Sequence, residues 1–421
     1  MDQLVYWIWL SLACTPGAQT FAKLLTKFND AYSVYDATDK QIRACVGYRI
    51  SDCSALINKD LTRAEKIYEF CKTKGVGIVT YNDEDYPESL RDIQTPPVLL
   101  YYRGKIPDMK KFRCAIVGTR RLSDYGRKNT FRLGYDMGCA GAIIVSGMAI
   151  GIDGVAMAGA IAAGAPVIAV LGSGIDVCYP EVHRRLAREI VKNGCVFTEY
   201  PPGTKPDKYN FPRRNRLISG LSTVTVVMEG NENSGAMITS RYAREQGRPL
   251  YALPGNVGAD GSDGTNLLLK NGAHPCTCAE DIVYAYQDCF PPVLNPFNLK
   301  VKMEVDMFEV LRELEVSAVT PTDNIFRPAR PQPKKPGERA AEPKAEESKP
   351  EEPKPDPSAL PQFDRDQLKI YKRIPENGDC SIESLVDENY SFKKVMGILL
   401  KLEMGRFIIM LPGDRVKRNN N

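Results

Sequence analysis

The chain has 421 residues, of which 43% are hydrophobic, 9% aromatic and 26% charged. This is a globular composition, and the length allows about two to four domains. The 56 Lys and Arg residues outnumber the 52 Asp and Glu residues by only four, so any signal for nucleic-acid binding must be local. With two histidines in the chain, a multi-histidine metal centre or a histidine-rich active site is nearly excluded.

The twelve cysteines are scattered without a Cys-x-x-Cys pair, and only Cys276 and Cys278 lie close together in the sequence. This spacing is typical of reduced thiols in a cytosolic protein and not of a disulfide framework or a zinc site. We therefore expect neither disulfides nor a bound metal.

No Lys or Arg precedes the apolar run at residues 4–10. The apolar stretch has roughly ten residues, whereas ~20 are needed to cross a membrane. We expect a buried helix here and a soluble, cytoplasmic protein without a membrane contact.

A turn at Thr15-Pro16-Gly17-Ala18 precedes an amphipathic stretch at 22–28, which predicts a helix opened by a Pro-Gly turn. The turn resembles half of a helix-hairpin-helix unit, whose glycine can hold a DNA phosphate. A packed helical cap is the interpretation that we favour, because a single Pro-Gly turn is common. Residues 1–105 are thus predicted to form a small helical domain, of SAM or helix-hairpin-helix type.

Continuous apolar runs alternate with helix-like stretches through residues 112–286. Such runs indicate strands that are buried on both faces, and the helices between them predict an α/β fold with a doubly wound parallel sheet. The predicted strands are 114–117, 142–145, 166–171, 195–197, 223–228 and 249–253.

Small, hydroxyl-bearing or basic residues follow most of these strands. The first strand runs into Gly118-Thr119-Arg120-Arg121, the second into Ser146-Gly147, and the fifth is followed by Ser234-Gly235. Ligands bind at the carboxyl ends of strands in open α/β sheets, so these loops should converge on one site. Glycines expose backbone N–H groups and arginine matches phosphate geometry, which predicts an anion site, most plausibly for phosphates.

Two segments make this site basic, 113–132 with six Lys and Arg residues and 203–216 with five, each against a single Asp. The aromatic residues Tyr209 and Phe211 are interleaved in the second segment, with Tyr200 just before it. Basic groups beside aromatic rings suit single-stranded nucleic acid, because backbone charge and base stacking are met together. A solvated basic surface is the alternative.

Cofactor and catalytic motifs are weak. Gly172-Ser173-Gly174 matches only the first half of a dinucleotide fingerprint, and no Gly-Lys-Ser/Thr occurs, which argues against NAD or ATP. The carboxylates Asp153, Asp176, Glu199 and Glu229 follow or lie beyond separate strands, and His183 is expected to be structural. We expect no cofactor and no enzyme activity.

Apolar residues almost vanish from 326 to 358, where proline recurs nine times among Lys and Glu. This composition predicts a disordered linker. Residues 291–325 are an extension before it. After it, residues 359–416 predict a small domain of three helices, at 364–374, 381–385 and 391–404, with a short wing at 405–415.

Five motifs occur in an order and spacing that resemble the DprA/Smf family of bacterial DNA-processing proteins, over roughly residues 80–285. The motifs begin at Val117, Ser146, Gly172, Phe211 and Ser234. The resemblance implies an extended Rossmann-like domain at 106–290 that binds single-stranded DNA without sequence preference and forms a homodimer. It also implies a C-terminal winged-helix domain, RecA as a partner that is loaded onto DNA, and a role in natural transformation and recombination.

Carried over by motif, the resemblance assigns DNA contacts to Gly118, Thr119, Arg120, Arg121, Ser146, Gly147, Lys205, Lys208, Phe211, Arg213, Asn215, Arg216, Ser234, Gly235 and Thr239. The alternative function is a nucleotide-phosphoribohydrolase of the lysine-decarboxylase-like family, which has a similar sheet. That family carries a Pro-Gly-Gly-x-Gly-Thr-x-x-Glu motif, whereas the corresponding turn here, 233–239, has no Glu nearby.

The predicted linker gives a first test. Limited proteolysis should cut within 326–358 and leave a stable fragment that ends before it, because an extended, polar segment is open to protease. The fragment should keep single-strand binding in an electrophoretic shift. Loss of binding would place part of the primary site in residues 326–421.

Overall fold

The computed structural model describes residues 2–316 apart from 48–49, 291–293, 301–302 and 304. It also describes residues 365–419 apart from 376–378, 388–389, 391–393, 396–397, 400–401, 403–406 and 412–414. The chain divides into two compact units, Met1–Arg330 and Pro331–Asn421. The predicted linker at 326–358 lies outside the described residues. None of the helices in the described ranges is long and apolar enough to cross a membrane.

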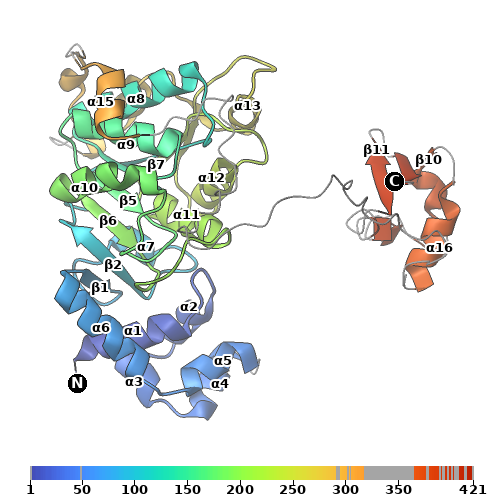
Figure 1. The fold of residues 1–421 in the computed structure, drawn as a ribbon, viewed down its shortest axis with the longest axis horizontal. Coiled ribbons are helices and arrows are strands. Elements are labelled where there is room, and N and C mark those ends of the chain that lie inside the picture. The colour runs from blue at the N-terminus through green and yellow to red at the C-terminus, as the bar shows by residue number, and fades with distance from the viewer. Residues whose placement is uncertain are drawn as a thin grey trace, which may run out of the picture. The chain divides into compact units, whose positions relative to one another are not determined.

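A nine-stranded sheet organises the first unit, with the strand order β1-β2-β6-β5-β4-β3-β7-β8-β9 (Figure 1). The strands are β1 (Gly77–Thr80), β2 (Leu99–Gly104), β3 (Arg113–Val117), β4 (Ile143–Ser146), β5 (Val167–Val170), β6 (Cys195–Thr198), β7 (Val224–Val227), β8 (Leu250–Ala252) and β9 (His274–Pro275). From β6 to β9 all neighbours pair in parallel. The predicted doubly wound parallel sheet is therefore confirmed, with each of the six predicted strands present.

Two strands differ from the sequence-based prediction of a helical region at 1–105. β1 pairs antiparallel with β2, and β2 pairs antiparallel with β6, so residues 77–104 extend the large sheet at one edge. These strands have four and six residues, separated by a long turn and the short helix α7 (Glu88–Arg91). β1 contains only two apolar residues, Ile78 and Val79, which are too few to show a strand period.

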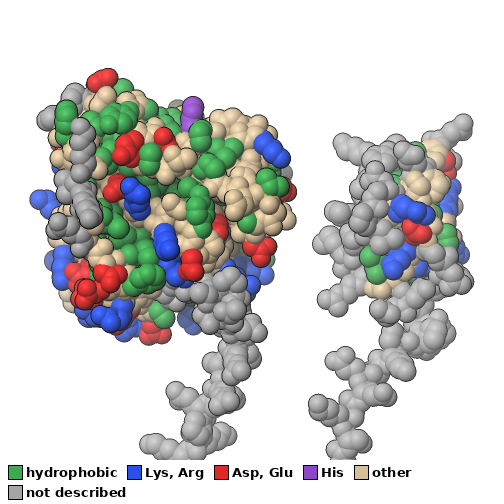
Figure 2. Space-filling view, turned by 90° about the horizontal axis from the view of Figure 1, so that it is seen from above, with side chains coloured by type: hydrophobic (Ala, Val, Ile, Leu, Met, Phe, Trp, Pro, Cys, Tyr) green, Lys and Arg blue, Asp and Glu red, His purple; other side chains and the backbone are tan. Residues whose placement is uncertain are grey.

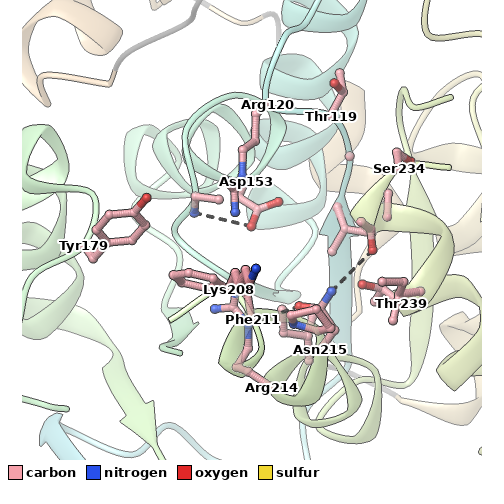
Figure 3. A pocket seen from close by; sticks show the side chains of 18 of the residues that line it. Thr119, Arg120, Asp153, Tyr179, Lys208, Phe211, Arg214, Asn215, Ser234 and Thr239 are labelled. Atoms are coloured by element: carbon pink, nitrogen blue, oxygen red, sulfur yellow. Dashed lines mark hydrogen bonds between the residues drawn. The ribbon is translucent and has the colours of Figure 1, made fainter. Parts of the chain in front are cut away.

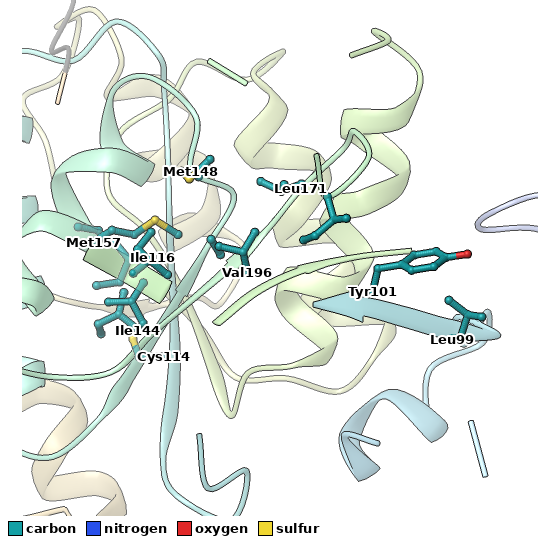
Figure 4. Close-up of a cluster of buried hydrophobic side chains, with 14 of the residues drawn as sticks. Leu99, Tyr101, Cys114, Ile116, Ile144, Met148, Met157, Leu171 and Val196 are labelled. Atoms are coloured by element: carbon teal, nitrogen blue, oxygen red, sulfur yellow. The ribbon is translucent and has the colours of Figure 1, made fainter. Parts of the chain in front are cut away.

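Helices cover both faces of the sheet because successive strand residues point to opposite sides. On β3, Cys114 and Ile116 join one buried cluster with α8 (Asp124–Cys139), α9 (Ile152–Ala162) and α10 (Arg184–Asn193). Figure 4 shows Cys114, Ile116 and Ile144 packed beside Met157 of α9. Ala115 and Val117 join a second cluster with α7, α11 (Asn210–Gly220), α12 (Gly235–Glu245) and α13 (Asp263–Lys270).

The N-terminal helices share the first cluster with the sheet. They are α1 (Gln3–Ala13), α2 (Thr20–Leu25), α3 (Ala31–Asp36), α4 (Asp39–Val46), α5 (Ile50–Ile57) and α6 (Thr62–Lys74). In α1 the residues Val5, Trp7, Ile8, Trp9 and Leu10 are buried, which confirms the predicted buried helix. Their apolar contacts continue to Leu99 and Tyr101 of β2, so this region packs directly on the sheet.

After β9 the first unit ends in α14 (Glu280–Tyr286), the 3-10 helices η2 (Gln287–Cys289) and η3 (Pro296–Lys300), and α15 (Met307–Glu313). On the face shown in Figure 2, basic side chains lie among acidic and apolar ones. This mixture agrees with the small net charge of the whole chain.

The second unit has its own small core, with Ile370, Ile382, Leu399 and Val416 among the buried residues. Its described elements are α16 (Arg365–Arg373), β10 (Asp379–Ser381), η4 (Ile382–Leu385), β11 (Ile408–Leu411) and β12 (Arg415–Arg418), with the antiparallel order β10-β12-β11. Much of the predicted third helix, 391–404, and of the wing, 405–415, lies outside the described residues, so the winged-helix assignment stays a prediction.

Candidate functional site

A pocket of about 540 Å³ opens where the strand order reverses, at the carboxyl ends of β3 and its neighbours. After β3 the chain adds strands on one side, toward β6, and after β7 it adds them on the other side, toward β9. The loops that follow β3 and β7 therefore diverge and leave a crevice between them. Figure 3 shows side chains from the surrounding loops and from α9, α11 and α12 turned toward this space. The pocket is lined by Val117, Gly118, Thr119, Arg120, Ala149, Asp153, Tyr179, Pro206, Lys208, Phe211, Pro212, Arg214, Asn215, Ile218, Ser234, Gly235, Ala236, Ile238 and Thr239.

The loop after β3 is held by backbone contacts on both sides. Thr119 N–H donates to the Glu229 carbonyl (2.7 Å), and the Thr119 carbonyl accepts from Ile152 N–H (3.1 Å) at the start of α9. A Cβ on Gly118 would stand 2.5 Å from the Ile152 side chain, so only glycine fits between these elements. With the backbone fixed in this way, Arg120 projects into the pocket and stays exposed to solvent.

Two buried charges flank the loop after β4. Asp153 accepts from Gly147 N–H (3.1 Å) and Ala149 N–H (3.4 Å), while Arg214 donates to the carbonyls of Gly147 (2.9 Å) and Val170. A Cβ on Gly147 would lie 2.5 Å from Arg214 Nη2 and 2.7 Å from Asp153 Oδ2. Burial lowers the pKa of Arg214 to about 10, with Asp153 opposing the shift. The pair therefore fixes the loop and the inner face of α11.

Three planar groups stand in a row at the mouth of the pocket. The rings of Tyr179 and Phe211 are 5.3 Å apart between centroids and inclined by 32°. The Arg120 guanidinium lies over the Phe211 ring at 5.6 Å. Tyr179 is 41% exposed, so its ring remains open to a ligand. A cation and two aromatic faces are the groups that hold stacked bases next to a phosphate.

The opposite wall is the N-terminus of α12. Ser234 precedes the helix without capping it, and its hydroxyl has no protein partner. Asn215 Nδ2 donates to the Gly235 carbonyl (3.3 Å) and so joins α11 to this wall. Free N–H groups at a helix start, beside a free hydroxyl, favour an anion.

The sequence-predicted residues separate into two groups. Nine line the pocket: Gly118, Thr119, Arg120, Lys208, Phe211, Asn215, Ser234, Gly235 and Thr239. Six do not. Of these, Arg121, Lys205 and Arg213 are exposed outside the pocket, Gly147 and Ser146 are buried in the β4 loop, and Arg216 is buried in an ion pair with Glu199.

Sequence reasoning did not place Tyr179 or Arg214 in the site. Arg214 is three residues after Phe211 and Ile218 is seven after it, so helical spacing alone puts all three on one face of α11. Tyr179 follows β5 at a distance of nine residues, and its nearness to Phe211 depends on the tertiary fold.

The carboxylates near the site are all engaged. Glu229 accepts from Ser123 N–H (2.9 Å), Asp176 accepts from Gly203 N–H (2.8 Å), and Glu199 pairs with Arg216. In the described parts of the chain no group of three His, Cys, Asp or Glu residues could hold a metal ion. The arrangement offers donors and ring faces to a ligand.

His183 supports the β4 loop from behind the pocket. It is fully buried in η1 (Glu181–His183), and its Nδ1 lies 3.0 Å from the Met148 carbonyl, so Nδ1 carries the proton and donates. Met148 has a φ of 55°, a conformation that a non-glycine residue adopts only when its surroundings hold it. Burial lowers the pKa of His183 from its usual 6.5.

The lowered pKa of His183 predicts that the folded protein loses stability in acid. Above about pH 7 the residue is neutral in both the folded and unfolded states, whereas below ~6.5 only the unfolded state takes up the proton. The free energy of unfolding should therefore fall by up to about 1.4 kcal/mol per pH unit until the pH reaches the folded-state pKa. Urea unfolding between pH 7.5 and 5.5 measures this fall.

His183→Gln should remove that part of the pH dependence. The exposed His274 provides the matched control, since His274→Gln should retain it. Equal pH dependence in the wild type and His183→Gln would contradict the assignment.

Comparison with known proteins gives a consistent result. A family model described as DNA recombination-mediator protein A matches residues 77–287. Protein Smf of Synechocystis sp. is 39% identical over 204 residues, which are 48% of this chain and 51% of that protein. The DNA processing protein DprA of Bacillus subtilis is 38% identical over 212 residues, which are 50% of this chain and 71% of that protein. The chain thus spans about half the length of the Synechocystis relative.

A solved structure extends the similarity to the fold. The X-ray structure of DNA processing protein A from Streptococcus pneumoniae superposes with a TM-score of 0.60 at 31% sequence identity. The superposition covers 68% of this chain and 98% of that one.

Proposed function

The chain belongs to the DNA recombination-mediator protein A family, and we propose that it binds single-stranded DNA without sequence preference in the pocket between β3 and β7. The observation that carries this proposal is the row formed by Arg120, Phe211 and Tyr179 beside the N-terminus of α12. Cationic and N–H donors meet phosphates, and open ring faces meet bases of any sequence.

Phosphate contacts come from two sides of the pocket in this proposal. Arg120, Thr119 and Lys208 act from one side, while Ser234 and the first N–H groups of α12 act from the other. The exposed residues Arg121, Lys205 and Arg213 lie outside the pocket and extend the basic track along the strand. Charged donors of this kind bind phosphate strongly and make the affinity fall as salt rises.

Base contacts require an unpaired strand. The exposed ring of Tyr179, backed by Phe211, can stack on a base only when that base is free of its complement, because paired bases present only their edges. Among the described residues, the pocket has no array of side-chain amides and carboxylates aimed at base edges. Asp153 lines the pocket, but its carboxylate accepts hydrogen bonds from backbone N–H groups. Binding should therefore favour single strands over duplex and ignore sequence.

Family membership supports a proposal for the wider role. We propose a cytoplasmic DNA-processing protein that acts in DNA uptake, natural transformation and recombination, and that loads RecA onto the strand it holds. It forms a homodimer through the Rossmann-like domain, and residues 359–416 form a winged-helix domain. Binding proceeds without catalysis, because the carboxylates around the pocket are held by backbone N–H groups or arginines and none is free as a base.

The phosphate role predicts a defect for Arg120→Ala. Removing one charge-assisted contact should weaken binding to a dT oligonucleotide about tenfold or more. It should also flatten the slope of log affinity against log salt by about 0.7. Fluorescence anisotropy across a salt series measures both values, and adding Arg213→Ala should flatten the slope further.

Arg63→Ala is the matched control, since Arg63 is an exposed arginine on α6 in the N-terminal helical region. It should leave affinity and slope unchanged. A folded Arg120→Ala protein with wild-type affinity and slope would remove the pocket from the DNA interface.

The stacking role predicts a defect for Tyr179→Ala that depends on bases. Loss of one stacking ring should weaken binding to a dT oligonucleotide by about 5- to 100-fold, because one base–aromatic stack contributes about 1–3 kcal/mol. Binding to an abasic oligonucleotide of equal length should be unaffected, and Tyr179→Phe should bind as the wild type does. An equal loss on both oligonucleotides would show that Tyr179 does not stack on a base.

A further inference from the structure

A buried ion pair lies on the side of α11 that faces away from the pocket. Arg216 Nη2 is 2.6 Å from Glu199 Oε2, and the two side chains are 3% and 5% exposed. Glu199 directly follows β6, so the pair ties α11 to the end of that strand. Charges this deeply buried are stable only when each compensates the other, and removing one partner alone leaves the other charge without compensation.

Other polar atoms of these two side chains are also buried. Arg216 Nε and Nη1 and Glu199 Oε1 are buried and have no protein hydrogen-bond partner. Both residues line a small, partly open cavity of about 20 Å³, together with residues of the Thr15–Ala18 turn and of the segment before β2. A cavity of this size holds one water molecule, which can bridge such groups.

The N-terminal turn forms part of the wall of this cavity. Gly17 has a φ of +75°, and a Cβ at this position would lie 3.5 Å from Arg216 Nε and 3.8 Å from Arg213 Cβ and Cγ. The turn predicted from Pro16 and Gly17 therefore rests on the back of α11, against two of its arginines.

Two sides of α11 therefore have different contacts. Phe211, Arg214, Asn215 and Ile218 line the pocket, whereas Arg216 does not. At 2% exposure, Arg216 cannot reach a phosphate in the pocket without breaking its pair with Glu199.

We propose that Arg216 is a positioning residue for the DNA site, and that the Thr15–Ala18 turn, the buried pair and one bridging water together hold α11 in place. The N-terminal helical region then contributes to DNA binding through α11 and not through a phosphate contact of its own. This inference rests on the proposed function of the pocket, and it differs from the motif-based expectation that Arg216 contacts DNA.

Paired substitutions separate the two roles. Arg216→Met leaves the Glu199 carboxylate buried without compensation, so the melting temperature should fall by roughly 5–10 °C. Affinity for a dT oligonucleotide should fall at least as far as in Arg120→Ala. In the double variant Arg216→Met with Glu199→Met, two apolar side chains replace the pair, and both melting temperature and affinity should recover toward the wild type. The salt slope should be unchanged in both proteins.

A direct phosphate contact gives a different pattern. The double variant would then regain its melting temperature but stay as weak as Arg216→Met, with a slope flattened by about 0.7. That result overturns the positioning role while leaving the pocket as the DNA site. Absence of single-strand binding by the wild-type protein would instead overturn the proposed function, and with it the link from the pair to DNA.

Gly17→Ala tests the turn separately. It adds a methyl group beside Arg216 Nε at a positive φ, and should lower both melting temperature and single-strand affinity without changing the salt slope. Gly75→Ala is the control, because Gly75 also has a positive φ, +61°, and nothing lies within 4 Å of its Cβ position. Gly75→Ala should lower the melting temperature alone. Affinity losses that are equal in the two variants, or absent in both, would overturn the role of the turn.

Discussion

The reversal of strand order between β3 and β7 is the constraint on which the site depends. Because the chain adds strands in opposite directions from this point, the loops after β3 and β4 leave one side while the loop after β7 leaves the other. The crevice between them is narrow, so its loops touch through backbone atoms. The bond from Thr119 N–H to the Glu229 carbonyl joins the two sides directly, and Gly118 must lack a side chain for it to form. The groups that we propose to bind phosphate are therefore positioned by main-chain contacts before any ligand arrives.

The three arginines of α11 show how the fold divides one basic segment into different tasks. Arg213 is exposed, Arg214 is buried at the floor of the pocket with Asp153 nearby, and Arg216 is buried on the opposite side with Glu199. Their spacing of one and two residues directs them around the helix at about 100° per residue. Two of the three thus stabilise the position of α11, at a desolvation cost that only a compensating carboxylate can offset. Only part of this arginine-rich segment therefore forms a basic surface.

The sequence predicted the sheet well because its signal is local. Each of the six predicted strands is a continuous apolar run, and burial on both faces makes such runs visible without tertiary information. β9 has two residues, and β1 has only two apolar residues, Ile78 and Val79, so neither shows a pattern. Nine of the fifteen predicted site residues line the pocket, because the ends of parallel strands are brought together by topology alone. Arg216 and Ser146 could not be placed in this way, since their burial depends on Glu199 and on the Ile116 carbonyl, which are distant in sequence.

The arrangement of α11 links the binding site to the most distant part of the first unit in sequence. In the proposed complex a strand seated against Phe211 and Asn215 would contact one side of the helix, whereas the Thr15–Ala18 turn contacts the other, with about 200 residues of chain between them. Since the helix is a rigid body at this length, a shift imposed on one side is felt at the other. Glu199 and Arg216 resist such a shift because any separation leaves each buried charge without its partner. In our proposal the N-terminal helices, which carry none of the pocket-lining residues, help to hold the aromatic row in register with the loops around the pocket.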